Sequence, residues 1–85
     1  MLEIHTKKIT MRSIIFGVAD VTGKCADYFG FFKHEEDSKK ELVIQMEREM
    51  KEKGVDLILK NDRVIKMVDD RTEEIVFIIH PIVLR

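Results

Sequence analysis

The pattern of apolar and polar positions predicts one clear helix near the middle of the chain. Apolar residues recur there at helical spacing. They are Leu42, Val43, Met46 and Met50. Ser38 and Glu41 match a capping box, with Ser38 as the N-cap residue, and Gly54 supplies a C-terminal stop. We therefore expect a helix from Lys39 to Lys53, with two lysines in its last turn where the helix dipole favours cations.

Three strands are expected after this helix. Residues 55–60 are apolar and β-branched, residues 64–68 form a second such run, and residues 75–79 are continuously apolar. Turns are predicted between them at Asn61-Asp62 and at Asp69 to Thr72, because these residue types tolerate turn geometry. A strand that is apolar at every position is typical of the centre of a sheet. Pro81 should end its hydrogen-bond ladder.

The first third of the chain is ambiguous. Residues 2–9 alternate loosely and indicate a short strand. Residues 12–33 contain β-branched residues and three glycines, which favour a hairpin turning at Thr22-Gly23. A helical projection of the same residues instead gathers most of the apolar ones, from Ile14 to Phe32, on one half of the circumference. We predict a helix from Arg12 to Lys33, with the hairpin as the alternative.

These elements predict an α+β protein in the order strand, helix, helix, strand, strand, strand. Two helices would pack on one face of a small, mainly antiparallel sheet. The 85 residues are the length of a single domain, so residues 1–85 are assigned to one. A last strand that is apolar on both faces would leave uncovered apolar surface, which is typical of an interface.

Composition narrows the class of protein. A net charge of −1 argues against a nucleic-acid partner, since such proteins gather an excess of Lys and Arg. One cysteine excludes an internal disulfide framework and fits a reducing cytoplasm. No signal peptide is recognised, and the longest uncharged run falls short of the ~20 residues of a membrane-spanning helix. Few Asn and Gln residues together with many Glu and Lys residues are typical of the composition of heat-adapted proteins. The alternative is that this composition arose by chance in a short chain.

No local pattern of catalytic or ligating residues is present. His5, His34, His80 and Cys25 show no metal-ligand spacing, and Cys25 is expected to be a small buried hydrophobe. The acidic runs at residues 35–37 and 69–70 are expected to be solvated turn charge, because adjacent exposed carboxylates share one environment. The glycines fit no phosphate-binding loop. We therefore expect no catalytic residue, metal or cofactor.

Aromatic residues concentrate in one segment, Tyr28-Phe29-Gly30-Phe31-Phe32. Such residues can stack on bases, but basic residues do not alternate with them, so core packing is favoured. Phe31 is the exception, because the helical projection leaves it on the polar side. Phe31 and the apolar tail residues Ile82 and Leu84 are the candidate interface residues.

The expected order of elements looks like that of the RelE/ParE family of small toxins. The segment Arg63 to Asp70, followed by Ile75 to His80, is similar to the closing hairpin of that family. The chain departs from the family in not being basic, in lacking the long loop before the sheet, and in Pro81 after the histidine. The resemblance implies a ribonuclease in which Arg63 contacts phosphate.

The sequence therefore leaves two candidate functions. The first is a cytoplasmic, non-enzymatic binding or regulatory module that acts as a homodimer or with a protein partner. This hypothesis is supported by the absence of a catalytic pattern in the sequence and by the apolar surface that the last strand is expected to leave uncovered. The alternative is the toxin-type ribonuclease or another protein that acts on nucleic acid.

Overall fold

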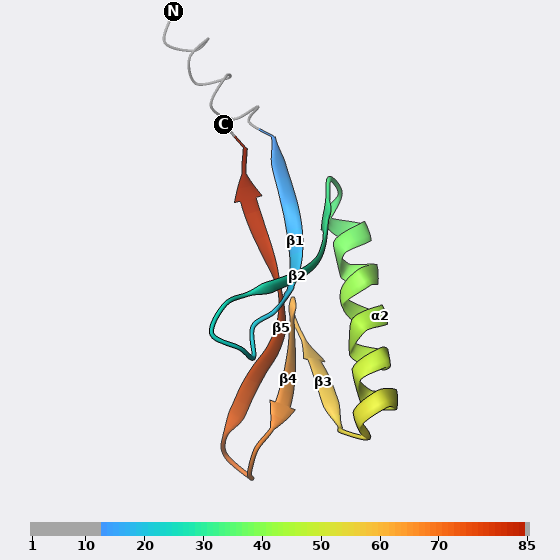
Figure 1. Ribbon diagram of the computed structural model, residues 1–85, viewed down its shortest axis with the longest axis vertical. Coiled ribbons are helices and arrows are strands. Elements are labelled where there is room, and N and C mark those ends of the chain that lie inside the picture. Colours follow the sequence, from blue (N-terminus) through green and yellow to red (C-terminus); the bar gives the residue numbers. More distant parts are fainter. Residues whose placement is uncertain (1–12, 85) are drawn as a thin grey trace, which may run out of the picture.

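In the part of the chain that the structure describes, one antiparallel sheet of five strands is covered on one face by a single helix (Figure 1). The computed structural model describes residues 13–84. Its elements are β1 (Ile14–Asp20), β2 (Asp27–Phe32), α2 (Glu35–Lys53), β3 (Leu57–Lys60), β4 (Arg63–Met67) and β5 (Glu73–Val83). The strands lie in the order β2-β1-β5-β4-β3. The α+β class is confirmed, and the expected strand at residues 2–9 lies outside the described part of the chain.

The helix predicted from Arg12 to Lys33 is wrong, because residues 14–32 form the hairpin β1–β2. Both faces of these strands carry apolar side chains, so the two-residue alternation that marks a strand is hidden. A β-bulge hides it further: Val18 is opposite Gly30 and Ala19 is opposite Tyr28, so Phe29 is an extra residue. Within residues 13–84 the architecture is therefore one helix on the sheet, in the order β-β-α-β-β-β, and not two helices.

Helix α2 begins four residues earlier than expected, and its capping box is not formed. His34 occupies the N-cap position without a side-chain hydrogen bond. Ser38 is instead buried inside the first turns, where its Oγ donates a hydrogen bond to the carbonyl oxygen of Glu35 at 2.6 Å. Three acidic residues lie in the first turn and are stabilised there by the positive end of the helix dipole.

The C-terminal end of α2 agrees with the prediction. Gly54 has a φ of 65°, and its N–H donates to the carbonyl oxygen of Met50 at 2.9 Å. This left-handed backbone favours glycine. The turn between β3 and β4 is confirmed as well, since Asn61 has a φ of 58°, which asparagine tolerates better than most residues.

The expected turn after β4 is organised by Asp69. Its Oδ1 accepts hydrogen bonds from the backbone N–H groups of Arg71, at 2.8 Å, and Thr72, at 2.7 Å. The bond from Arg71 is the largest cause that holds the pKa of Asp69 below its ordinary value of 3.8, and the bonds from Thr72 add to it. The ionised carboxylate is therefore the form that this turn favours.

Asp69→Ala should weaken folding in a pH-dependent way. Because the folded protein lowers the pKa of Asp69, its stabilising contribution is present above the ordinary pKa and disappears as the pH falls through the lower folded value. The difference in melting temperature between wild type and Asp69→Ala should be largest near neutral pH and shrink below about pH 4. Thermal unfolding followed by circular dichroism from pH 2.5 to 7 measures this, with Asp70→Ala as the control. A difference that stays constant with pH would contradict the prediction.

Strand β5 is the central strand, as expected, but Pro81 does not end it. β5 runs to Val83, and Pro81 lies opposite Phe16 of β1. The N–H of Leu84 donates to Ser13 across β1, whereas the N–H of Ile79 donates to Asp62 on the opposite side. N–H groups alternate in direction along a strand, so the nitrogen of Pro81 points away from β1. On that side β5 pairs with β4, but this pairing ends at Ile78 and does not extend to Pro81. The missing N–H of Pro81 therefore costs no hydrogen bond of the sheet.

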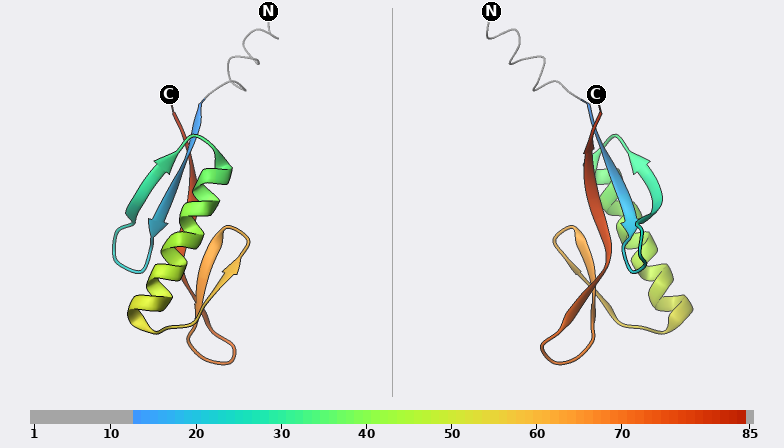
Figure 2. Two further views of the ribbon diagram at one scale, coloured as in Figure 1. Left: turned by 90° about the vertical axis from the view of Figure 1, so that its right-hand side faces the viewer. Right: turned by 60° about the vertical axis from the view of Figure 1, so that its left-hand side comes forward.

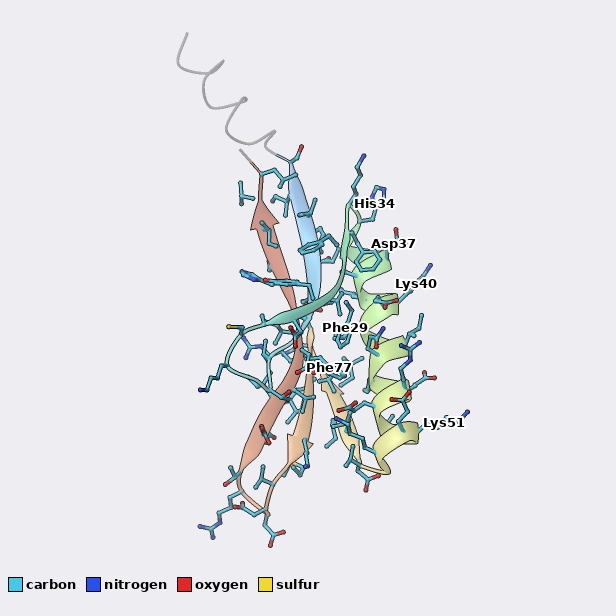
Figure 3. All side chains as sticks on the ribbon, in the orientation of Figure 1. Phe29, His34, Asp37, Lys40, Lys51 and Phe77 are labelled. Atoms are coloured by element: carbon cyan, nitrogen blue, oxygen red, sulfur yellow. The ribbon has the colours of Figure 1, made fainter. Side chains whose placement is uncertain are left out.

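The core lies between the sheet and α2. Its buried members are Val18, Leu42, Leu57, Val64, Val76 and Phe77. Figure 3 shows Phe77 and Phe29 between the sheet and the helix, whereas Lys40 and Lys51 point outward from α2. The rings of Phe29 and Phe77 meet edge to face, with centroids 5.2 Å apart. The helix thus covers one face of the sheet, and no other described element lies on the opposite face (Figure 2).

Candidate interaction surface on the back of the sheet

The face of the sheet opposite α2, here called the back face, is mostly apolar. Its membership follows from strand alternation: Val18, Val64 and Leu57 belong to the core under the helix, so their strand neighbours project from the other side. The register of the five strands then assigns the paired residues to the same side. The back-face residues are Ile15, Gly17, Ala19, Tyr28, Phe31, Ile58, Lys60, Arg63, Ile65, Met67, Glu73, Ile75, Ile78, His80 and Ile82.

An aromatic side chain crosses one half of the back face. Tyr28 of β2 lies over Gly17 of β1, and its hydroxyl forms a hydrogen bond of 3.1 Å with Nδ1 of His80 on β5. A Cβ atom on Gly17 would lie 2.6 Å from the Tyr28 ring and 3.3 Å from the Phe31 ring. Glycine at this position therefore leaves the space in which the two rings lie.

Tyr28 and Phe31 form one raised unit, here called the aromatic pair. Their rings stack with centroids 4.8 Å apart and an angle of 24° between the planes. Phe31 is 54% exposed, so much of the pair faces solvent although its underside rests on β1. Exposed aromatic rings held in one orientation are typical anchors of protein interfaces.

The other half of the back face is hollowed. An open hollow of about 540 Å³ lies at the turn between β3 and β4. Its apolar lining residues are Ile65, Ile75 and Ile79. Lys60 and Glu73 also line the hollow and form an ion pair at 3.4 Å across β4. Lys60 and Glu73 are well exposed, so this pair contributes little to stability.

Arg63, the predicted phosphate contact, lines the same hollow. The element order that carried the resemblance to the toxin family is wrong, since residues 14–32 form two strands and not a strand and a helix. The lining also includes the carboxylates of Asp62 and Glu73, which would repel a phosphate group. The surroundings of Arg63 thus give no support to the ribonuclease alternative.

The three candidate interface residues occupy different places. Phe31 is exposed on the back face, although the helix from which its exposure was inferred does not exist. Ile82 is half-buried on the same face, opposite Ile15. Leu84 is exposed just beyond the end of β5. The structure thus brings Phe31 and Ile82 onto one surface.

The histidine and cysteine side chains that could bind a metal ion do not come together in the structure. Cys25 is exposed in the loop between β1 and β2, so the expectation that it is buried is wrong. His34 is the N-cap residue of α2, and His80 lies on the back face with Tyr28. His5 lies outside the described residues. Within residues 13–84, no group of three His, Cys, Asp or Glu side chains is arranged to hold a metal ion.

Comparison with known proteins gives no relative. No protein-family model matches the chain, and neither the curated proteins nor the solved structures contain a significant match. None of the helices in the described part of the chain is both long and apolar enough to cross a membrane.

The contact between Tyr28 and His80 leaves no local signal in the sequence. The two residues are 52 positions apart, and they meet only because β1 lies between β2 and β5 and carries glycine at the crossing point. Gly17 allows the Tyr28 ring to pack closely on β1, and an isolated glycine in a β-branched run is the signal that the sequence offers for such a contact.

Proposed function

We propose that this protein is a small binding module that acts as a homodimer, joined through the back face of the sheet. The observation that carries the proposal is the exposure of apolar side chains on a face that α2 does not cover. The large exposed side chains there include Phe31, Ile58, Met67 and Ile75, each at least 38% exposed. Contiguous apolar surface of this kind commonly marks an interface.

A second copy of the chain suits this face in size. Strands about 4.8 Å apart with a rise of about 3.3 Å per residue give the five-strand face a projected area of roughly 500 Å². The accessible surface of such an uneven face is larger than its projection. A stable complex buries about 800 Å² per partner, so face-to-face packing of two sheets reaches the required order of size.

Charge also suits a second copy. The middle of the back face carries no formal charge, and its charged members, Lys60, Arg63 and Glu73, gather around the hollow. The whole chain has a net charge of −1. Two copies that meet through this face would therefore bury little charge and repel each other weakly.

The molar mass in solution tests the proposal. Wild-type protein at micromolar concentration, measured by light scattering after size exclusion, should show twice the chain mass of 10.0 kDa. Ile58→Lys, on the back face, should give the single-chain mass because a lysine there would be desolvated in the dimer. Ile44→Lys on α2 is the matched control, since Ile44 and Ile58 are 52% and 51% exposed, and it should stay dimeric.

Two results would overturn the proposal. The first is a single-chain mass for wild type at all micromolar concentrations, which would show that two copies do not join through this face. The second is a dimer that survives Ile58→Lys and dissociates with Ile44→Lys, which would place the interface on the helix. Circular dichroism of each variant checks that it is folded.

A further inference from the structure

The two halves of the back face differ in shape. The aromatic pair stands on the half formed by β2 and β1, where Phe31 is 54% exposed. The hollow of about 540 Å³ lies on the half formed by β5, β4 and β3. Ile78 of β5 is opposite Ala19 of β1 and also opposite Arg63 of β4, so the two halves adjoin directly.

The hollow suits aromatic rings in chemistry as well as in size. Ile65 and Ile75 of the back face line it, together with Ile79, which also packs against the core under α2. Its volume lies in the range of cavities that hold a drug-sized molecule. Lys60 and Arg63 line it, and a cation within about 6 Å of an aromatic ring face is attracted to that ring. The aromatic pair offers such faces, because its rings are stacked and partly exposed.

We propose that in the homodimer the aromatic pair of each copy enters the hollow of the other copy. This inference rests on the proposed dimer and specifies its register. A two-fold axis requires that if residue i of one copy contacts residue j of its partner, then j also contacts i. A raised unit beside a hollow on one face satisfies this condition, since one rotation places both pairs in both hollows.

Cross-linking between chains tests the register. The test protein carries Cys25→Ser, which removes the exposed native thiol, together with Phe31→Cys and Ile75→Cys. It is used at a concentration far above the raised dissociation constant expected when the Phe31 ring is lost, so that the dimer is still populated. A short bis-maleimide is added to a mixture of ¹⁵N-labelled and unlabelled copies. Mass spectrometry should find positions 31 and 75 linked between labelled and unlabelled chains. The matched control carries Ile44→Cys in place of Ile75→Cys and should give no link of this kind.

Affinity gives a second measurement that does not need new thiols. Phe31→Ala should raise the dimer dissociation constant by roughly thirty-fold, as expected for a central aromatic anchor. Leu59→Ala, at an exposed position on the helix side of β3, should change it less than about three-fold. Analytical ultracentrifugation over a range of concentrations provides both constants.

The outcomes separate the register from the dimer. A dimer in which position 31 links only to position 31 of the partner, or in which Phe31→Ala leaves the dissociation constant unchanged, overturns the register and leaves the homodimer standing. A wild-type protein that stays at the single-chain mass overturns both. Links between 31 and 75 of different chains, with the affinity loss, support the inference.

Discussion

Phe77→Ala is expected to lower the free energy of unfolding by about 3–5 kcal/mol, the usual cost of removing a buried phenylalanine ring. Phe77 is 2% exposed and lies on the central strand, where it contacts the core under α2. Small domains usually have about 5–15 kcal/mol of stability, so this loss would remove a large share of it. Urea unfolding followed by circular dichroism measures the change.

Phe29→Ala is the matched control for this result. Phe29 meets the Phe77 ring edge to face but is 38% exposed, so its loss should cost only about 1 kcal/mol. Because the two rings touch, the double variant should be more stable than the sum of the single losses predicts, by about 0.5–1.5 kcal/mol. Equal losses for Phe29→Ala and Phe77→Ala would show that the core does not lie where the structure places it.

Gly17→Ala is expected to lower the free energy of unfolding by about 1–3 kcal/mol, the usual cost of overpacking. The new Cβ would lie 2.6 Å from the Tyr28 ring, so the ring must move and its hydrogen bond to His80 is lost. Chemical unfolding at one protein concentration measures the stability. The chemical shifts of the His80 ring report whether Tyr28 has moved.

Gly23→Ala makes the same chemical change at an open position. A Cβ there would have one neighbour, a backbone oxygen at 3.8 Å, so the change in stability should stay within about 0.5 kcal/mol. If Gly17→Ala proves as stable as Gly23→Ala and keeps the His80 shifts of wild type, Tyr28 does not occupy the space above Gly17.

The C-terminal half of the fold was predictable because its local signals are independent of distant contacts. Gly54 and Asn61 stop or turn the chain by their own backbone preferences, and Asp69 does so through its side-chain hydrogen bonds. The start of α2 was misplaced because Ser38 matched a cap motif. The acidic residues at 35–37, taken as solvated turn charge, in fact form the first helical turn.

The N-terminal hairpin was not predictable from periodicity. Strand β1 buries apolar residues on both faces, as Val18 and Ala19 show, and the bulge at Phe29 in β2 shifts the alternation. The resulting spacing of apolar residues along the chain resembles that of a helix. The three glycines were the better signal, since a helix would lose about 1 kcal/mol at each of them.

The candidate site was only partly predictable. Exposure of Phe31 was expected, but from a helical projection that does not apply. The hollow and the contact from Tyr28 to His80 depend on strand order, which brings residues together across 52 positions. No local pattern carries that information.

The position of β5 has a consequence for the order of folding. β5 pairs with β1 on one side and with β4 on the other, and β1 and β4 do not pair with each other. During synthesis, therefore, the hairpins β1–β2 and β3–β4 have no shared strand until residues up to Val83 have left the ribosome. Such distant pairings slow folding, and until β5 pairs with both hairpins, only α2, which contacts β1, β2 and β3, can hold them together.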